Sequence, residues 1–188
     1  SPGASLKFLQ RAWRVADDVT SDPGVDVTTG DVALRKTTHK MISEITTLVE
    51  GQRFNVIVAR CMELINAVRK AIDTGCGAND PAVREAVTFA AQAMSLFAPY
   101  VAEDMWELLG YQPSVASSSW PTADPALLVA DEVTMVVQVN GKVRGKIQVS
   151  PDVDEDQARQ LALADANVKR FVADKSIVKV IARLPRMM

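Results

Sequence analysis

The sequence has few of the residues from which catalytic and metal centres are built. Its 188 residues include only two cysteines and one histidine, and aromatic side chains make up 5% of the composition. Cys61 and Cys76 have no CxxC spacing, so we expect neither a disulfide nor a zinc site. The scattered glycines form no phosphate-binding loop. A catalytic centre or a bound cofactor is therefore not expected in this chain.

Long apolar runs are also missing. No segment approaches the roughly 20 consecutive apolar residues that a membrane-spanning helix requires. The start at Ser1 lacks the charged and apolar stretches of a secretory leader. We therefore expect a cytoplasmic protein without membrane contact. The hydrophobic content of 48% is enough for one large or two small cores.

Charge is distributed unevenly along the chain, although the net charge is only -2. Residues 1–132 carry 11 Lys and Arg against 17 Asp and Glu, which gives a net charge of -6. Residues 133–188 carry 10 against 6, which gives +4. Because local positive charge attracts polyanions, the last quarter of the chain is the candidate part for binding one.

The apolar residues of the first 110 positions recur at intervals of three and four, which indicates helices. The pattern predicts five of them, over residues 4–19, 31–50, 54–73, 81–98 and 100–109. Asp80 followed by Pro81 is typical of a helix start, and Pro99 and Gly110 are typical of helix ends. Wide apolar stripes on successive helices with short connections predict an antiparallel bundle.

Residues 111–132 are rich in proline and serine, which predicts a linker in which Trp120 can dock on the bundle. Beyond it, two runs with a period of two flank Asn140-Gly141, and both turn residues tolerate a positive φ. This is a strong β-hairpin signal. A helix from Asp154 to about 164, a helical turn over 168–172 and a third strand over 177–184 complete the prediction.

The predicted fold class is therefore α+β. An antiparallel bundle of about five helices occupies residues 1–110, and the linker occupies residues 111–132. A small α+β domain with a β-hairpin and one or two helices occupies residues 133–188.

Three cations follow the hairpin turn at a spacing of two residues: Lys142, Arg144 and Lys146. Strict strand alternation would place them on one face, about 7 Å apart, a repeat comparable with the phosphate spacing of a nucleic acid. The apolar residues between and after them would face the core, namely Val143, Ile147 and Val149. Gathering like charges is easier to explain if a polyanion neutralises them. Alternatively, the lysines protect an exposed edge strand from aggregation, and the residues alone leave both readings open.

Further cations could widen this patch. Lys179 and Arg183 share a face of the predicted third strand, and Arg186 follows it. No aromatic residue alternates with the basic ones, which favours contact with folded RNA over stacking on single-stranded bases. The lone His39 is expected on the polar side of its helix, as a solvated or hydrogen-bonded residue.

Residues 137–147, with the sequence VQVNGKVRGKI, closely resemble the hairpin near the C-terminus of bacterial leucyl-tRNA synthetases. Further matches to this family occur in family order and span nearly the whole chain. They are residues 8–13, 34–36, 39–40, 54–55, 62–66, 98–99, 106 and 120–121.

The resemblance implies the C-terminal part of a class I aminoacyl-tRNA synthetase. It implies that the bundle is the anticodon-binding-type helical domain and that the small domain is flexibly tethered and grips the outer corner of the L-shaped tRNA. The parent would be a ligase that joins leucine to tRNA(Leu) with ATP and Mg. This chain matches neither the catalytic nor the editing signatures, so alone it is expected to be inactive. The implied partners are tRNA(Leu) and the catalytic body of the parent chain, and a monomer is expected.

Carried over by position, the resemblance gives two sets of candidate tRNA-binding residues. The first set is Asn140, Lys142, Arg144, Lys146 and Arg186. The second set, on the bundle, is Arg11, Arg14, Lys36, His39 and Lys40. Two alternatives stay open. One is the equivalent region of an isoleucyl-, valyl- or methionyl-tRNA synthetase, and the other is a non-enzymatic module whose bundle binds partner helices while the basic hairpin only guards a sheet edge.

Overall fold

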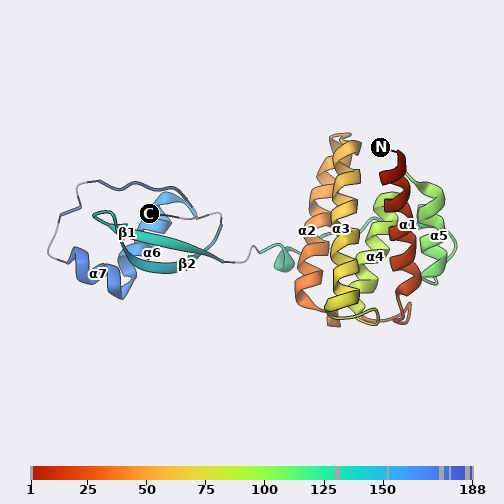
Figure 1. The fold of residues 1–188 in the computed structure, drawn as a ribbon, viewed down its shortest axis with the longest axis horizontal. Helices are drawn as coiled ribbons and strands as arrows, with labels where there is room; N and C mark the ends of the chain where they lie inside the picture. The colour runs from red at the N-terminus through yellow and green to blue at the C-terminus, as the bar shows by residue number, and fades with distance from the viewer. Residues whose placement is uncertain are drawn as a thin grey trace. The chain divides into compact units, whose positions relative to one another are not determined.

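The computed structural model describes residues 2–129, 132–151, 153–173, 176–177, 179–184 and 187. The chain divides into two compact units, Ser1–Leu128 and Val129–Met188. Among the described residues, five helices dominate the first unit, and a hairpin with two short helices dominates the second (Figure 1). The predicted fold class, a helical bundle followed by a small α+β part, is confirmed.

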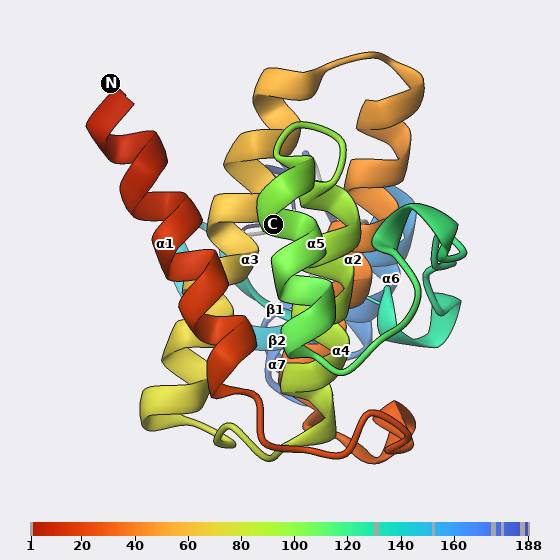
Figure 2. The same ribbon diagram turned by 90° about the vertical axis from the view of Figure 1, so that its right-hand side faces the viewer.

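The five predicted helices are all present in the first unit, and Figure 2 shows them from the side. They are α1 (Pro2–Asp18), α2 (Val32–Glu50), α3 (Phe54–Thr74), α4 (Pro81–Met94) and α5 (Pro99–Leu108). The end of α4 differs from the prediction, because the helix stops at Met94 instead of Ala98. The ring of Pro99 disfavours helical geometry in the residue before it, and Ala98 has φ -136° and ψ 63°.

Two aspartates start α2 and α4 and tie these starts together. Asp31 accepts a hydrogen bond from the Leu34 N–H at 2.9 Å, and Asp80 accepts one from the Ala82 N–H at 2.8 Å. Each satisfies an N–H group that the first helical turn leaves without a partner. The Asp31 N–H also donates to the Asp80 carboxylate at 3.0 Å. The two caps therefore fix the relative position of α2 and α4.

The bundle core is centred on α4, which packs on α2, α3 and α5. Arg84 is a charged residue within this core, at 3% exposure. Its guanidinium donates to the hydroxyl and carbonyl oxygens of Ser21 at 2.9 and 2.5 Å and to the carbonyl of Leu109 at 2.8 Å. A buried charge is tolerated when its donors are satisfied in this way. Arg84 thus joins the loop after α1 to the end of α5.

Residues 111–128, here called the strap, pack along the bundle. Val115 is buried at 4% exposure, and the ring of Trp120 meets Phe89 edge-on with 5.5 Å between centroids. Trp120 Nε1 also donates to the Thr46 hydroxyl at 2.9 Å. Within this proline- and serine-rich segment the described secondary structure consists of two 3-10 turns, Val115–Ser117 and Pro125–Leu127. The predicted docking of Trp120 is confirmed.

The second unit contains the predicted hairpin and both predicted helical segments. Strands β1 (Val133–Val139) and β2 (Lys142–Val149) are antiparallel. Asn140 and Gly141 have φ of 52° and 74°, as a type I′ turn requires. Helices α6 (Glu155–Ala164) and α7 (Ala166–Val172) pack on the hairpin. The small core between them contains Met135, Val137, Val149, Ala158, Ala162 and Val168.

The predicted third strand over 177–184 is wrong for the described residues. Residues 177 and 179–184 contain no strand, and Arg183 forms only an isolated bridge with Met187. Val178 lies outside the described residues. Alternating residues indicate an extended chain, but a strand also needs a continuous partner edge. Here the neighbouring contact is a single bridge between Val136 and Met187.

A β-bulge interrupts the pairing of β2. Val137 pairs with Gly145, and the next residue of β1, Gln138, pairs with Val143. Arg144 is thus the additional residue, without a partner on β1. One additional residue reverses the alternation of side chains on the turn side of the bulge.

The bulge separates the hairpin cations. Lys146 pairs with Val136 and Lys142 pairs with Val139. Paired residues share a face, whereas positions 136 and 139 of β1 point to opposite faces. The prediction that the three cations share one face is therefore wrong. For the same reason Val143 is 52% exposed and does not face the core.

Candidate nucleic-acid interface

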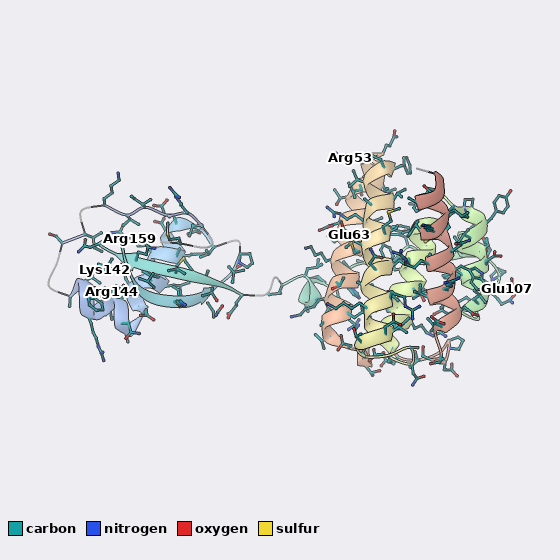
Figure 3. The ribbon with its side chains drawn as sticks, viewed as in Figure 1. Arg53, Glu63, Glu107, Lys142, Arg144 and Arg159 are labelled. Carbon is teal, nitrogen blue, oxygen red and sulfur yellow. The ribbon has the colours of Figure 1, made fainter. Side chains whose placement is uncertain are left out.

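A groove of about 680 Å³ lies beside the hairpin turn of the second unit. The turn residues Asn140 and Gly141 line it, together with residues of α6, α7 and the segment after α7. Three cations line it as well, namely Arg159, Lys179 and Arg183, and no Asp or Glu is among its described lining residues. Figure 3 labels Arg159, Lys142 and Arg144 near the turn. The described lining of the groove therefore combines apolar residues with three cations.

The sequence reasoning named two of the three groove cations and missed the third. Lys179 and Arg183 line the groove, although no described strand carries them. Arg159 lies on α6 next to the buried Ala158. The cap at Asp154 shows in the sequence where α6 begins. Helical periodicity then places Arg159 beside the apolar stripe of α6, which contains the buried Ala158 and Ala162. The direction of that stripe toward the hairpin turn depends on tertiary packing.

The hairpin candidates differ in their surroundings. Lys142 and Lys146 are exposed, and neither forms an ion pair with a described residue. Asn140 is exposed in the turn and lines the groove. Arg144 is half-buried, and its guanidinium lies over the ring of Phe171. Arg186 lies outside the described residues.

On the bundle, α1 carries a second group of cations. Lys7, Arg11 and Arg14 line a cavity of about 330 Å³ together with Gln10 and Arg69. Arg11 donates to the Asn66 side chain at 2.6 Å. The predicted pair, Arg11 and Arg14, is therefore brought together on one side of α1.

Two carboxylates compensate the charge of Arg69 in this cavity. Hydrogen bonds to Asp73 and then to Asp18, both at 2.6 Å, raise the pKa of Arg69. The positive charge that remains available to a ligand comes from α1.

The candidates on α2 are not gathered into a site. His39 is 6% exposed and does not lie on the exposed side of the helix, although it is hydrogen-bonded as one reading of the sequence expected. Its Nδ1 accepts the Asp124 N–H at 2.9 Å, so Nε2 carries the proton and donates to Glu85 at 3.2 Å. Lys40 is exposed beside Glu44, at 4.0 Å, and Lys36 is half-buried.

Arg35 completes the network around His39. Its guanidinium donates two hydrogen bonds to the Glu85 carboxylate, each of 3.2 Å. His39 thus joins the strap to α2 and α4, and its ring nitrogens are both occupied by contacts within the bundle.

The remaining carboxylates and thiols of the described residues do not form a catalytic or metal site. Glu103 accepts hydrogen bonds from the Ser114 hydroxyl and the Val115 N–H and so fixes the start of the strap. Both cysteines are free. Within the described ranges, no three His, Cys, Asp or Glu side chains gather as a metal site would require. None of the helices found there has the length and apolar character needed to span a bilayer.

The chain matches a known protein family over most of its length. Residues 31–159, more than half of its length, match the anticodon-binding domain of tRNA ligase. The chain belongs to this family. The match runs from the start of α2 through the hairpin and into α6, so this anticodon-binding domain assignment includes parts of both compact units.

The curated relatives that resemble this chain are leucine–tRNA ligases. The protein from Paenarthrobacter aurescens strain TC1 is 57% identical over 187 residues, and that from Acidothermus cellulolyticus is 54% identical over 187 residues. The protein from Tropheryma whipplei is 36% identical over 183 residues. The alignments cover 97–100% of this chain but 22% of each relative. The chain thus spans about a fifth of the length of these relatives.

A solved structure supports the fold. The chain is similar to part of the AgnB2 LeuRS of Agrobacterium radiobacter K84, solved as a ternary complex with tRNA and LeuAMS. The TM-score is 0.66 at 22% sequence identity, over 99% of this chain and 25% of the other. At this identity the likeness shows that the chain shares the fold of that part of the protein.

Proposed function

We propose that this chain is the tRNA-binding part of a leucine–tRNA ligase. It holds tRNA(Leu) so that the acceptor end reaches an active site elsewhere in the parent chain. The observation that carries the proposal is the groove beside the hairpin turn, which has three cations and no described carboxylate in its lining. Relatives at 51–57% identity are named leucine–tRNA ligases. This favours the leucyl enzyme over the isoleucyl, valyl and methionyl enzymes.

The parent enzyme, on this proposal, uses ATP and Mg to activate leucine and transfers it to tRNA. The chain corresponds to 22% of such ligases. Its own contribution is binding and positioning, without catalytic turnover and without a cofactor of its own. We propose that it acts in the cytoplasm as a monomeric part of one parent chain.

The geometry suits an RNA backbone better than single-stranded bases. Arg159, Lys179 and Arg183 supply charge-assisted donors along a concave surface, and the lining contains no aromatic side chain among its described residues. Each phosphate that a cation neutralises releases counterions, so affinity falls as salt rises, with a slope of about 0.7–0.9 per contact. Single-stranded binding surfaces depend instead on aromatic stacking.

The test measures the binding of tRNA(Leu) to the full chain by fluorescence anisotropy, at salt concentrations from low to physiological. Replacing Arg159, Lys179 and Arg183 together with alanine should weaken binding about tenfold or more at low salt. Because phosphate contacts are lost, the salt slope should fall by about one for each contact.

A control variant with the same change in net charge replaces with alanine three bundle cations that are not tRNA-binding candidates: Arg53, Arg60 and Lys70. It should retain more of the affinity and of the salt slope than the groove variant. Undetectable binding of the unmodified chain at low salt, or equal losses in both variants, would overturn the proposal.

A further inference from the structure

A stacked pair of side chains, Arg144 and Phe171, joins the hairpin to α7. The guanidinium carbon of Arg144 lies 4.0 Å from the centroid of the Phe171 ring. Favourable cation–π contacts extend to about 6 Å, so this guanidinium is at full contact distance. Arg144 is half-buried and Phe171 is 37% exposed, so the pair lies at the surface of the second unit.

The local structure brings these two residues together in two steps. The bulge leaves Arg144 without a partner on β1, and the next residue, Gly145, is buried against α7. A Cβ added at Gly145 would lie 2.9 Å from Val168 Cγ2, so α7 approaches more closely than a larger residue would allow. Val168 and Phe171 are three residues apart on α7 and share a face. Contact of Val168 with Gly145 therefore places Phe171 next to Arg144.

The N–H donors of the Arg144 guanidinium have no acceptor among the described residues. It forms no hydrogen bond or ion pair with any residue that the structure describes, and the Phe171 ring covers one face of its plane. By contrast, the guanidinium groups of Arg84 and Arg35 donate hydrogen bonds to buried acceptors within the bundle. A planar group with five N–H donors that is held from one face can meet a phosphate with its edge.

We infer that Phe171 is a positioning residue that holds Arg144 as a fixed planar donor for a phosphate of the bound RNA. The inference rests on the proposed tRNA-binding function and deepens it. Fixing the side chain before binding reduces the rotamer entropy that an arginine loses on contact. A lysine at position 144 would keep the charge but lose the planar pair of donors.

The inference is tested by a double-mutant cycle on tRNA(Leu) affinity in the full chain. Arg144→Ala should weaken binding about tenfold and lower the salt slope by about one. Phe171→Leu should weaken binding about fivefold in the unmodified chain but have no further effect once Arg144 is alanine. Arg144→Lys should recover only part of the loss, and Phe171→Tyr should bind as the unmodified chain does.

The matched control is the same cycle with Lys146 in place of Arg144, because Lys146 lies two residues further along β2. The effects of Lys146→Ala and Phe171→Leu should multiply without coupling. A purely structural role of Phe171 would weaken binding equally in every background and would overturn the inference. An unchanged salt slope in Arg144→Ala would indicate stacking on a base and would overturn the phosphate assignment.

A measurement without RNA tests the geometry. In the NMR spectrum of the free chain, the side-chain protons of Arg144 should be shifted upfield by the Phe171 ring, and Phe171→Leu should abolish the shift. Absence of this shift would overturn the inference while tRNA binding persists. If the unmodified chain does not bind tRNA at all, the proposed function fails and the inference fails with it.

Discussion

Burial in the bundle controls the chemistry of the Cys61 thiol. Cys61 lies on α3 and is completely buried, and this burial raises its pKa to about 12. Cys76 is exposed in the connection between α3 and α4. The same residue type therefore behaves as an apolar core residue at one position and as an accessible thiol at the other.

The raised pKa of Cys61 predicts a loss of stability at high pH. The unfolded thiol has a pKa of about 8.5, so above that pH the unfolded chain releases a proton that the folded chain retains. The stabilisation is fully present below the unfolded pKa and is lost at about 1.4 kcal/mol per pH unit as the pH rises toward the folded value. In urea unfolding, the stability difference between the unmodified chain and Cys61→Val should change in favour of the variant from pH 8 to pH 10. A difference that is independent of pH would contradict this account.

His39 shows how far the sequence could predict a single residue. Its position on a helix indicated a solvated or hydrogen-bonded histidine, and hydrogen bonding is what the structure contains. The partner at Asp124 is 85 residues away in the chain. The helical periodicity of α2 contains no information about the strap, so the burial of His39 could not be predicted from its neighbours.

At the scale of elements, α7 depends on its first turn. It has seven residues, Ala166–Val172, and short helices gain little from their own hydrogen bonds. The carboxylate of Asp165 accepts the N–H groups of Asn167 and Val168 at 2.9 and 3.0 Å. This cap helps to hold α7 where Phe171 meets the hairpin.

Replacing Asp165 with alanine should therefore destabilise α7 selectively. We expect a cost of about 1 kcal/mol, because two N–H groups lose their acceptor. In hydrogen exchange, the amides of α7 should exchange faster, whereas those of the bundle should not change. Asp165→Asn keeps an oxygen acceptor and should retain most of the protection. Equal exchange rates in Asp165→Ala and the unmodified chain would contradict the role of the cap.

The hairpin shows what element-level reasoning could and could not predict. Asn140-Gly141 encodes its turn in two adjacent residues, so the turn was predictable. The bulge was missed, although Gly145 inside the strand pattern was a signal for it, because an isolated strand glycine often marks a bulge or a close backbone approach. The third strand failed because strand pairing depends on a partner edge that no local pattern describes.

At the scale of the whole molecule, the two units have separate cores. The first core joins all five bundle helices and the strap, whereas the second contains far fewer buried residues between the hairpin and its two helices. Smaller cores bury a smaller fraction of their surface and are less stable. The two units should therefore unfold in separate steps, the smaller one first.

Tryptophan distribution makes this prediction measurable. All three tryptophans, Trp13, Trp106 and Trp120, lie in the first unit. Urea unfolding followed by tryptophan fluorescence should report the bundle alone, whereas far-UV circular dichroism should report both units. We expect the circular dichroism signal to begin its change at lower urea. Coincident curves from the two probes would show that the units unfold together.

The sequence by itself determined the α+β class, the five bundle helices, the hairpin turn, the cap of α6 and the family resemblance. These features depend on periodicity and on residues that are close in the chain. Only the tertiary structure decided that the strap joins His39, that the bulge separates Lys142 from Lys146, and that Arg159 reaches the groove. Each of these depends on contacts between distant segments, whose geometry is set by packing and not by local sequence.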